Sequence, residues 1–285
     1  MKIARTTDEL RNTVKEARSK GLSIGLVPTM GALHAGHRSI IERARRENDF
    51  VVVSVFVNPT QFNNPNDLAT YPRTEEADIA MLEEVGVDLA FIPTVEAVYG
   101  NTPDTRVFDL GPVAEVMEGA RRPGHFNGVA QIVSRLFEWS QPTRAYFGQK
   151  DFQQIAVIRR MAQIEGFDDI DIVACPIIRE KDGLALSSRN VRLTPEHRAA
   201  APAIFKTLGM ARAHRELGGM NISEVKKYVI DTLNALPGVE VEYFEIVDAQ
   251  TMQPVDNWYE TSDAVGCITV WFGDVRLIDN VTFDR

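Results

Sequence analysis

Two histidines three residues apart, His34 and His37, are the side chains of this sequence best suited to chemistry. They end the stretch Pro-Thr-Met-Gly-Ala-Leu-His-Ala-Gly-His at residues 28–37, which follows an apolar run and precedes residues of helical periodicity. The start of a helix carries unpaired backbone N–H groups and a partial positive charge, so phosphate binds there readily. Imidazoles at the same place add donors for charge that develops on a reacting phosphorus. The stretch therefore predicts a nucleotide site.

Two other interpretations of the histidine pair stay open. In the first, the only role of the pair is to cap backbone groups of the helix, although Gly31 and Gly36 favour close approach of a ligand. Zinc binding is the sharper alternative, but a lone His-x-x-His without a nearby cysteine pair is weak support for a metal site. Cys175 and Cys267 lie in apolar, strand-like runs, so we expect free, buried thiols.

Neutral amides follow the second apolar run of the chain, residues 50–57. Asn58 and Gln61 come directly after it, where a strand would end. Such side chains hold a substrate hydroxyl or carboxylate without adding charge. An ordinary Asn-Pro turn is the open alternative.

Three more polar segments join the expected elements. Gly-Gln-Lys-Asp at 148–151 links a short strand to a helix; Lys150 suits phosphate, and Asp151 either caps the helix or takes a ribose hydroxyl. Leu-Ser-Ser-Arg-Asn at 186–190 places two hydroxyls beside a guanidinium, which suits phosphate oxygens. Gly-His-Phe-Asn-Gly at 124–128 precedes an amphipathic helix. Neither a Gly-x-x-x-x-Gly-Lys-[Ser/Thr] loop nor a Gly-x-Ser-x-Gly elbow occurs, which argues against a P-loop hydrolase and a covalent serine.

Strand-like and helix-like segments alternate through the first 175 residues. The expected strands are residues 23–27, 50–57, 88–92, 145–147 and 170–174, and the expected helices are 36–47, 74–85, 128–139 and 151–165. Continuous apolar strands between amphipathic helices indicate a parallel sheet covered on both faces. Ligands of such folds bind beyond the carboxyl ends of the strands, which is where the polar motifs lie. We expect an α/β fold with a Rossmann-like, doubly wound parallel sheet over residues 1–178.

The pattern changes after about residue 180, which predicts a second, smaller α+β domain over residues 179–285. Thr194 and the following proline indicate a helix that runs towards Leu217. Asn221 with Glu224 resembles a capping box for a further helix. Three strands are expected at residues 239–248, 264–272 and 275–278, with a turn at 273–274.

The composition is that of a globular protein. The chain has 285 residues, of which 44% are hydrophobic and 25% charged, a formal charge of −9 and a pI of about 5.2. This balance argues against a general nucleic-acid binder. No apolar run approaches the roughly 18–20 residues that span a bilayer, and residues 1–9 contain no apolar segment of a signal peptide. We expect a cytoplasmic protein without a membrane or nucleic-acid partner.

Taken together, the motifs resemble one family over essentially the whole chain. Pro-Thr-Met-Gly-Ala-Leu-His-x-Gly-His, Val-Asn-Pro-Thr-Gln-Phe, Gly-His-Phe-x-Gly-Val, Phe-Gly-Gln-Lys-Asp and Leu-Ser-Ser-Arg-Asn are similar to those of the pantothenate synthetases (pantoate–β-alanine ligases), nucleotidyltransferases with a His-x-Gly-His element. The resemblance implies that ATP, pantoate and β-alanine are the substrates. It further implies a pantoyl-adenylate intermediate, release of AMP and pyrophosphate, Mg²⁺ with the ATP, and a homodimer built by the first domain.

The same resemblance implies roles for individual residues. The expected ATP-binding residues are Met30, Gly31, Ala32, Leu33, His34, Ala35, Gly36, His37, Gly148, Gln149, Lys150, Asp151, Ile178, Leu186, Ser187, Ser188 and Arg189. The expected catalytic residues are His37, His34, Lys150, Ser188 and Arg189. Gln61 and Gln154 would hold pantoate from two sides, with Asn58 beside them, and Ile178 would make a backbone contact to adenine. The Ser187–Arg189 loop would close over the nucleotide by a hinge motion of the second domain. No ligands for the metal are predicted.

Three rival functions follow from the same residues. A nucleotidyltransferase that acts on a phosphate acceptor would need several cations around that phosphate, whereas the 58–61 segment offers neutral amides. A fragment of an aminoacyl-tRNA synthetase conflicts with the charge of −9. A non-catalytic nucleotide sensor would not need the intact histidines and the Lys150–Asp151 pair.

Overall fold

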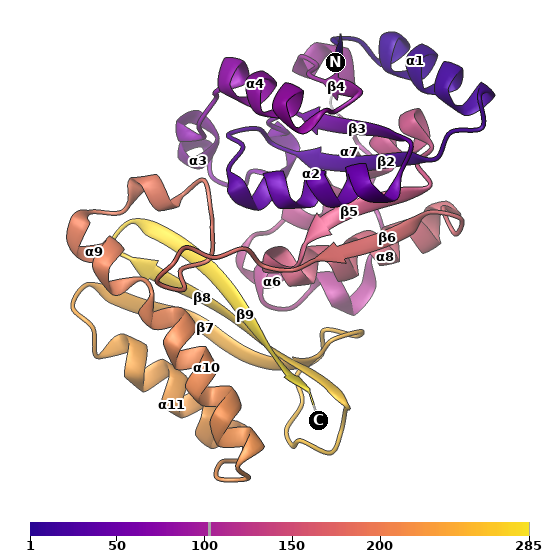
Figure 1. Ribbon diagram of the computed structural model, residues 1–285. Helices are drawn as coiled ribbons and strands as arrows, with labels where there is room; N and C mark the ends of the chain where they lie inside the picture. The colour runs from indigo at the N-terminus through magenta and orange to yellow at the C-terminus, as the bar shows by residue number, and fades with distance from the viewer. Residues whose placement is uncertain (102–103, 285) are drawn as a thin grey trace.

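The chain folds around two separate sheets, as the computed structural model in Figure 1 shows. The structure describes residues 1–101 and 104–284. The first sheet has six parallel strands in the order β1-β4-β3-β2-β5-β6. Its strands are β1 (Lys2–Ala4), β2 (Ile24–Thr29), β3 (Phe50–Val55), β4 (Leu89–Phe91), β5 (Arg144–Gly148) and β6 (Asp171–Cys175). The predicted doubly wound α/β fold is confirmed.

Helices cover both faces of this sheet. The α-helices are α1 (Thr7–Ser19), α2 (Ala35–Glu47), α3 (Pro65–Thr70), α4 (Glu75–Val85), α5 (Val95–Tyr99), α6 (Glu118–Arg121), α7 (His125–Ser140) and α8 (Phe152–Glu165), with short 3₁₀ turns η1 (Pro59–Gln61), η2 (Gly111–Ala114) and η3 (Gln149–Asp151). Successive strand residues face opposite sides, so Leu26 packs with α1, α7 and α8, and Val27 packs with α2 and α4. Both faces are therefore apolar, which explains the continuous apolar strands.

The order of the strands reverses between β2 and β5. The chain continues from β2 to β3 on one side, whereas β5 pairs with β2 on the other side and leads to β6. A crevice opens at the carboxyl ends of the strands at such a switch point, and ligands bind there. The segment after β2 contains the two histidines, and the segment after β5 contains Lys150 and Asp151. The topology thus brings two motifs more than one hundred residues apart to one place.

The second part of the chain has an α+β architecture, in which helices pack on one face of an antiparallel sheet. It contains η4 (Asn190–Arg192), α9 (Pro195–Ala200), α10 (Ala203–Glu216), α11 (Ile222–Asn234) and the antiparallel strands β7 (Val239–Asp248), β8 (Asp263–Phe272) and β9 (Val275–Asp284). One face of the sheet packs on α10 and α11. The other face packs Val265 and Cys267 against Met117 and Phe152 of the first part. The predicted domain boundary at residue 178 stays a prediction.

Several predicted elements differ from the observed ones. The single helix predicted from Thr194 to Leu217 is two helices, because Pro202 cannot continue the backbone hydrogen bonds of the first. The last strand runs to Asp284, and α7 begins at His125 instead of Gly128. The capping box of Asn221 is confirmed.

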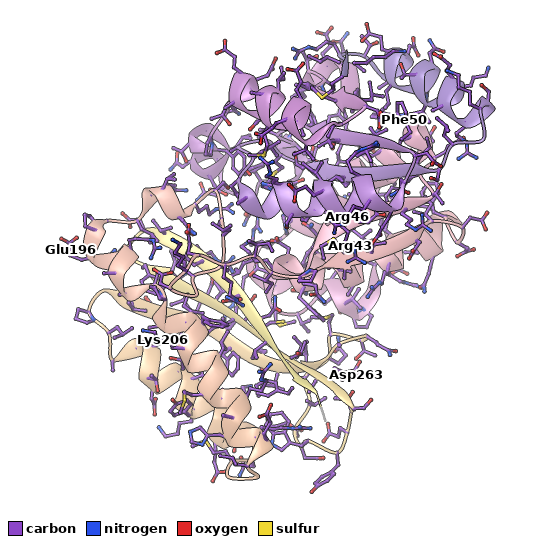
Figure 2. The ribbon with its side chains drawn as sticks, viewed as in Figure 1. Arg43, Arg46, Phe50, Glu196, Lys206 and Asp263 are labelled. Carbon is purple, nitrogen blue, oxygen red and sulfur yellow. The ribbon has the colours of Figure 1, made fainter. Side chains whose placement is uncertain are left out.

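The outer faces of the helices carry polar side chains, such as Arg46 on α2 and Lys206 on α10 (Figure 2). Arg43, labelled in the same view, reaches Glu47 on its own helix and the carbonyl oxygen of Ala174 in β6. Among the described residues no helix is long and apolar enough to cross a membrane.

Candidate active site

A buried carboxylate holds the turn that follows β2. Gly31 and Ala32 adopt positive φ angles of 78° and 49°. Asp78, which is 2% exposed, accepts hydrogen bonds from the backbone N–H groups of Ala32 at 3.0 Å and Leu33 at 2.8 Å. A Cβ atom on Gly31 would lie 2.9 Å from Asp78 Oδ2, so only glycine fits. The sequence gives no sign of this role, because Asp78 reads as one of several acidic residues at the start of α4.

The two histidines cap the first turn of α2. His34 is the N-cap, and its Nδ1 accepts from the N–H of Gly36 at 3.1 Å, while Nδ1 of His37 accepts from the N–H of His34 at 3.4 Å. The ring centroids lie 4.1 Å apart. A Cβ atom on Gly36 would lie 2.9 Å from the ring of His34, so this glycine makes room for the cap. Both histidines therefore cap the first turn of α2, and each uses only one ring nitrogen to do so.

The other ring nitrogen defines what the histidines offer a ligand. Burial, with smaller contributions from neighbouring cations, lowers the pKa of His34 to about 4 and that of His37 to about 3. Both rings are neutral at pH 7, and a neutral ring whose Nδ1 accepts has its proton on Nε2. Each histidine thus keeps one N–H donor. Because several backbone N–H groups of the turn already donate within the protein, phosphate binding would depend on these imidazoles more than on the helix start itself.

A cavity of about 210 Å³ lies at the switch point. We call it the nucleotide cavity. It brings together most of the predicted ATP-binding residues, namely Met30, His34, Gly36, His37, Gly148, Lys150, Asp151, Ile178, Leu186, Ser187, Ser188 and Arg189. The predicted substrate residues Asn58, Gln61 and Gln154 also line it. Gly31, Ala32, Leu33, Ala35 and Gln149 do not.

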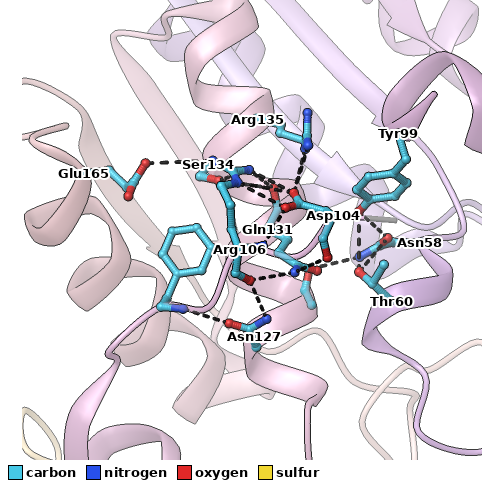
Figure 3. Close-up of polar contacts among 12 residues, drawn as sticks. Asn58, Thr60, Tyr99, Asp104, Arg106, Asn127, Gln131, Ser134, Arg135 and Glu165 are labelled. Carbon is cyan, nitrogen blue, oxygen red and sulfur yellow. Dashed lines mark hydrogen bonds and ion pairs between the residues drawn. The ribbon is translucent and has the colours of Figure 1, made fainter. Parts of the chain in front are cut away.

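Asn58 serves the site by holding its neighbours. The side chain is 1% exposed and donates to Gln61 Oε1 at 3.1 Å and to the carbonyl oxygen of Gly128 at 3.0 Å. Its Oδ1 accepts from the hydroxyls of Thr60 and Tyr99, as Figure 3 shows. These bonds occupy the side-chain amide of Asn58, so Asn58 orients Gln61. The amide of Gln61 in turn donates to Sδ of Met30 at 3.0 Å and lines the nucleotide cavity.

Lys150 and Asp151 form the turn after β5. Asp151 is the residue before α8, but its carboxylate makes no capping hydrogen bond, so the interpretation that it only caps is wrong. It lies 3.6 Å from the ammonium of Lys150 and is about half exposed. The carbonyl oxygens of Gln149 and Lys150 accept from the amide of Asn280 on β9, which ties the second sheet to this turn.

The loop that carries Ser187, Ser188 and Arg189 is held by a distant carboxylate. Ser187 Oγ accepts from the N–H of Arg189 at 3.2 Å. The guanidinium of Arg189 contacts Asp67 of α3 at 2.8 Å, and Arg192 contacts the same carboxylate at 3.5 Å. Arg189 is therefore paired with a carboxylate of the first part of the chain.

A family model described as pantoate-beta-alanine ligase matches residues 2–282. The chain belongs to this family. It is 60% identical to the pantothenate synthetase of Porphyromonas gingivalis, over 100% of both chains. The pantothenate synthetase of Thermus thermophilus superposes with a TM-score of 0.93 at 46% identity and full coverage of both chains. The pantoate-beta-alanine ligase of Francisella tularensis, solved in complex with beta-gamma ATP and beta-alanine, gives a TM-score of 0.81 at 35% identity, covering 99% of this chain and 98% of that one.

A ligase that joins an acid to an amine needs room for both of them and for ATP. A second cavity of about 370 Å³ supplies further space between the two sheets; we call it the interdomain cavity. It shares Lys150, Asp151, Gln154, Ser187 and Arg189 with the nucleotide cavity. This pantoate–β-alanine ligase therefore has two neighbouring chambers, and the residues that they share include predicted phosphate-binding residues.

The lining of the interdomain cavity also contains a buried ion cluster around Glu118. Its carboxylate receives two hydrogen bonds from Arg276, at 2.6 and 2.8 Å, and one from Tyr243 at 2.7 Å. Burial raises the pKa of Glu118, but the guanidinium of Arg276 more than offsets this and holds it at about 2. Glu118 is thus a permanent anion that joins α6 to β9. The sequence could not indicate this pair, whose members are 158 residues apart.

The two cysteines of the ligase are free and buried, as predicted. Burial raises the pKa of the Cys267 thiol to about 12, so it stays protonated. The zinc alternative finds no support, because the described residues contain no group of three or more His, Cys, Asp or Glu side chains that could hold a metal ion.

Proposed function

We propose that this ligase adenylates pantoate in the nucleotide cavity and then transfers the pantoyl group to β-alanine, which gives pantothenate, AMP and pyrophosphate. One observation carries the assignment of the site. A single cavity combines uncharged donors from the two histidines, the cations Lys150 and Arg189, and the amides Gln61 and Gln154. The donors suit a triphosphate, and the amides suit a small hydroxy acid.

The first step needs positioning and charge stabilisation more than covalent help. A carboxylate oxygen of pantoate attacks the α-phosphorus of ATP, the new P–O bond forms, and pyrophosphate leaves with the electron pair of the broken bond. Charge grows on the departing phosphate oxygens, where the Nε2–H groups of His34 and His37 would donate. Lys150, Ser188 and Arg189 would hold the remaining phosphate oxygens. Gln61 and Gln154 would orient the acid.

The second step converts the activated acid into an amide. The neutral amine of β-alanine attacks the acyl carbon, the C–N bond forms, the C–O bond to phosphate breaks, and AMP leaves while the nitrogen gives up a proton to a phosphate oxygen of the departing AMP. The mixed anhydride reacts readily with water, so the cavity must exclude it. Closure of the Ser187–Arg189 loop over the nucleotide is part of the proposal.

Mg²⁺ would enter with the ATP and neutralise part of the triphosphate charge. The donor set fits this, since the ion takes most of its oxygen ligands from phosphate and water and needs few from protein. Asp151 is the fitting carboxylate, because it lines the cavity, caps no helix and is half exposed. A homodimer, which rests on the family resemblance, and a cytoplasmic location, which is the expectation from the sequence, complete the proposal.

Exchange of labelled pyrophosphate into ATP tests the first step. We expect exchange that depends on pantoate and needs no β-alanine. His37→Ala should slow it about 10²- to 10³-fold, the cost of removing one donor to developing charge. Ser39→Ala, on the same helix turn, is the matched control and should leave the rate unchanged.

The outcome separates the rival functions. Exchange with phosphate acceptors and none with pantoate would support the alternative nucleotidyltransferase. Binding of ATP without AMP formation in a single turnover would support the sensor. Full exchange activity in His37→Ala would reject the role given to the histidine.

A further inference from the structure

The side-chain amide of Gln61 has its oxygen and its nitrogen in different surroundings. Oε1 accepts a hydrogen bond from Nδ2 of Asn58 at 3.1 Å, whereas Nε2 donates to Sδ of Met30 at 3.0 Å. A thioether sulfur is only a weak acceptor, so this NH2 group is available to a better one. Gln61 and Met30 both line the nucleotide cavity. An oxygen atom of a ligand there can therefore replace the sulfur as the partner of Nε2.

The orientation of Asn58 decides which end of the Gln61 amide is available. Nδ2 of Asn58 also lies 3.0 Å from the carbonyl oxygen of Gly128, which only accepts, so the nitrogen must lie on this side. Oδ1 of Asn58 then accepts from the hydroxyls of Thr60 at 3.1 Å and Tyr99 at 2.7 Å, as Figure 3 shows. Asn58 is 1% exposed, so these protein contacts decide its orientation, and the shortest of them comes from Tyr99.

The ring of Tyr99 is held where its hydroxyl reaches Asn58. Tyr99 is the last residue of α5. Its ring centroid lies 6.3 Å from that of Phe56, and the guanidinium carbon of Arg135 lies 5.3 Å from it. Burial, opposed by the hydroxyl of Thr60 and the charge of Arg135, raises the pKa of Tyr99. The hydroxyl therefore keeps its proton and can donate a hydrogen bond to Asn58.

A buried carboxylate fixes the guanidinium that contacts this ring. Oδ2 of Asp104 lies 2.9 Å from both Nε and Nη2 of Arg135, and the side chain of Asp104 is 2% exposed. Gln131, one turn earlier on α7, donates to the backbone carbonyl oxygens of Asp104 at 3.0 Å and Arg106 at 2.8 Å (Figure 3). Among the described residues that line the two cavities, none is Tyr99, Arg135 or Asp104. The effect of this network on a ligand is therefore indirect.

We propose that Tyr99 is a positioning residue of this ligase, which acts through Asn58 and keeps the NH2 group of Gln61 turned towards the acid substrate. The inference deepens the proposed function and rests on it. An NH2 group suits a carboxylate or hydroxyl oxygen, whereas an ammonium group carries only donors and finds no partner there. The arrangement thus favours a hydroxy acid over an acid in which an ammonium group replaces the hydroxyl.

The test removes the Tyr99 hydroxyl and follows the first half-reaction. In Tyr99→Phe the oxygen of Asn58 keeps only the longer contact with Thr60, so the amides of Asn58 and Gln61 lose their fixed orientation. Pyrophosphate exchange without β-alanine is measured over a range of pantoate and of ATP concentrations. We expect the KM for pantoate to rise about three- to tenfold, the effect of one hydrogen bond, and the KM for ATP to stay within twofold. Thr60→Val, which removes the longer contact, should raise the KM for pantoate less.

A double-mutant cycle with Asn58→Ala separates positioning from a general effect on the fold. Asn58→Ala removes the oxygen that Tyr99 contacts, so the addition of Tyr99→Phe should change the KM for pantoate by less than twofold. Thr94→Ala is the matched control on the same short helix, because the hydroxyl of Thr94 caps α5 by accepting from the N–H of Ala97 at 3.1 Å. This variant loosens α5 without removing the Tyr99 hydroxyl and should keep the KM for pantoate within twofold.

The outcomes distinguish the inference from the function on which it rests. An unchanged KM for pantoate in Tyr99→Phe would overturn the inference. An equal rise in both KM values, or the same rise in Thr94→Ala, would also overturn it, because either result shows a general loosening of the fold. Thr60→Val with Asn58→Ala provides the same cycle if Tyr99→Phe folds poorly. No pantoate-dependent exchange in the unaltered enzyme would reject the proposed function itself, and this inference with it.

Discussion

The two cavities of this ligase handle charge in opposite ways. The nucleotide cavity presents, beside the charged Lys150, Asp151 and Arg189, two neutral imidazoles whose positions are set by hydrogen bonds within a few residues, the caps of His34 and His37. The wall of the interdomain cavity is dominated by ion pairs between distant parts of the chain, such as Glu118 with Arg276. A neutral donor has little desolvation cost and stays available to a ligand, whereas a buried charge must first be matched by the protein. The first chamber is thus organised for binding, and much of the second for joining the two parts.

Removal of Glu118 is the most severe test of this comparison. Glu118→Ala leaves two guanidinium groups without their shared carboxylate, and breaking a buried pair from one side costs about 3–5 kcal/mol. Urea unfolding should show this loss. Glu138→Ala is the control, because Glu138 pairs with Arg11 at the surface. The free energy of unfolding of Glu138→Ala should stay within about 0.5 kcal/mol of that of the unaltered enzyme.

The pH dependence of Glu118 has a definite sign. Its pKa in the folded protein, about 2, lies below the ordinary value of 4.5. The stabilisation is therefore complete above pH 4.5 and is lost as the pH falls from 4.5 towards 2. Glu118→Gln should flatten the stability curve in that window. An equal loss in the Glu118 and Glu138 variants would mean that the interdomain ion cluster does not hold the parts together.

The same contrast explains what the sequence could predict. The histidine motif, the Lys150–Asp151 turn and the serine loop were predictable, because each is a contiguous segment whose chemistry is visible in its residue types. The alternation of apolar runs indicated the parallel sheet for the same reason. Local signals that do exist were sometimes missed: Pro202 divides the predicted long helix, and Thr6 with Glu9 forms the capping box of the unpredicted α1.

Residues that act through distant partners could not be predicted. Asp78 holds a turn 45 residues away, and Asp67 pairs with an arginine 122 residues away. Each is an ordinary acidic residue of a helix in the sequence, and only the folded chain supplies its partner. Asn58 illustrates the intermediate case. Its place after a strand predicted a site, but its hydrogen bonds show that it orients Gln61.

Two glycine substitutions test whether close backbone packing positions Gln61 in the nucleotide cavity. The start of α7 lies against η1 so closely that a Cβ atom on Gly128 would be 2.3 Å from the carbonyl oxygen of Thr60. Gly128→Ala must displace the turn that carries Gln61, at a cost of about 1–3 kcal/mol. We expect a raised KM for pantoate in pyrophosphate exchange, with a smaller change for ATP.

The control lies on α10, where nothing approaches within 4 Å of a Cβ atom on Gly209. Gly209→Ala should stabilise the fold by about 0.5–1 kcal/mol, since alanine favours the helix, and should leave both KM values unchanged. Equal kinetic constants in the two variants would show that the close contact at Gly128 does not position Gln61.

The smallest expected effect concerns the ion pair of Asp67 with Arg189. This pair joins distant parts of the chain, and its arginine also lines the nucleotide cavity. Both side chains are about one quarter exposed, so the pair adds only about 0–1 kcal/mol to stability. Its consequence for binding differs from that of Glu118, because Arg189 lines the nucleotide cavity and, in the function proposed above, exchanges Asp67 for phosphate. Asp67→Asn removes the competing carboxylate, so ATP should bind about two- to fivefold more tightly at low salt, and the gain should shrink as salt screens the exposed charges.

The control for this prediction is Asp182→Asn, which disrupts the pair with Arg198 and should change neither the affinity for ATP nor its salt dependence. Weaker ATP binding in Asp67→Asn would reverse the argument, because the carboxylate would then assist the nucleotide instead of competing with it.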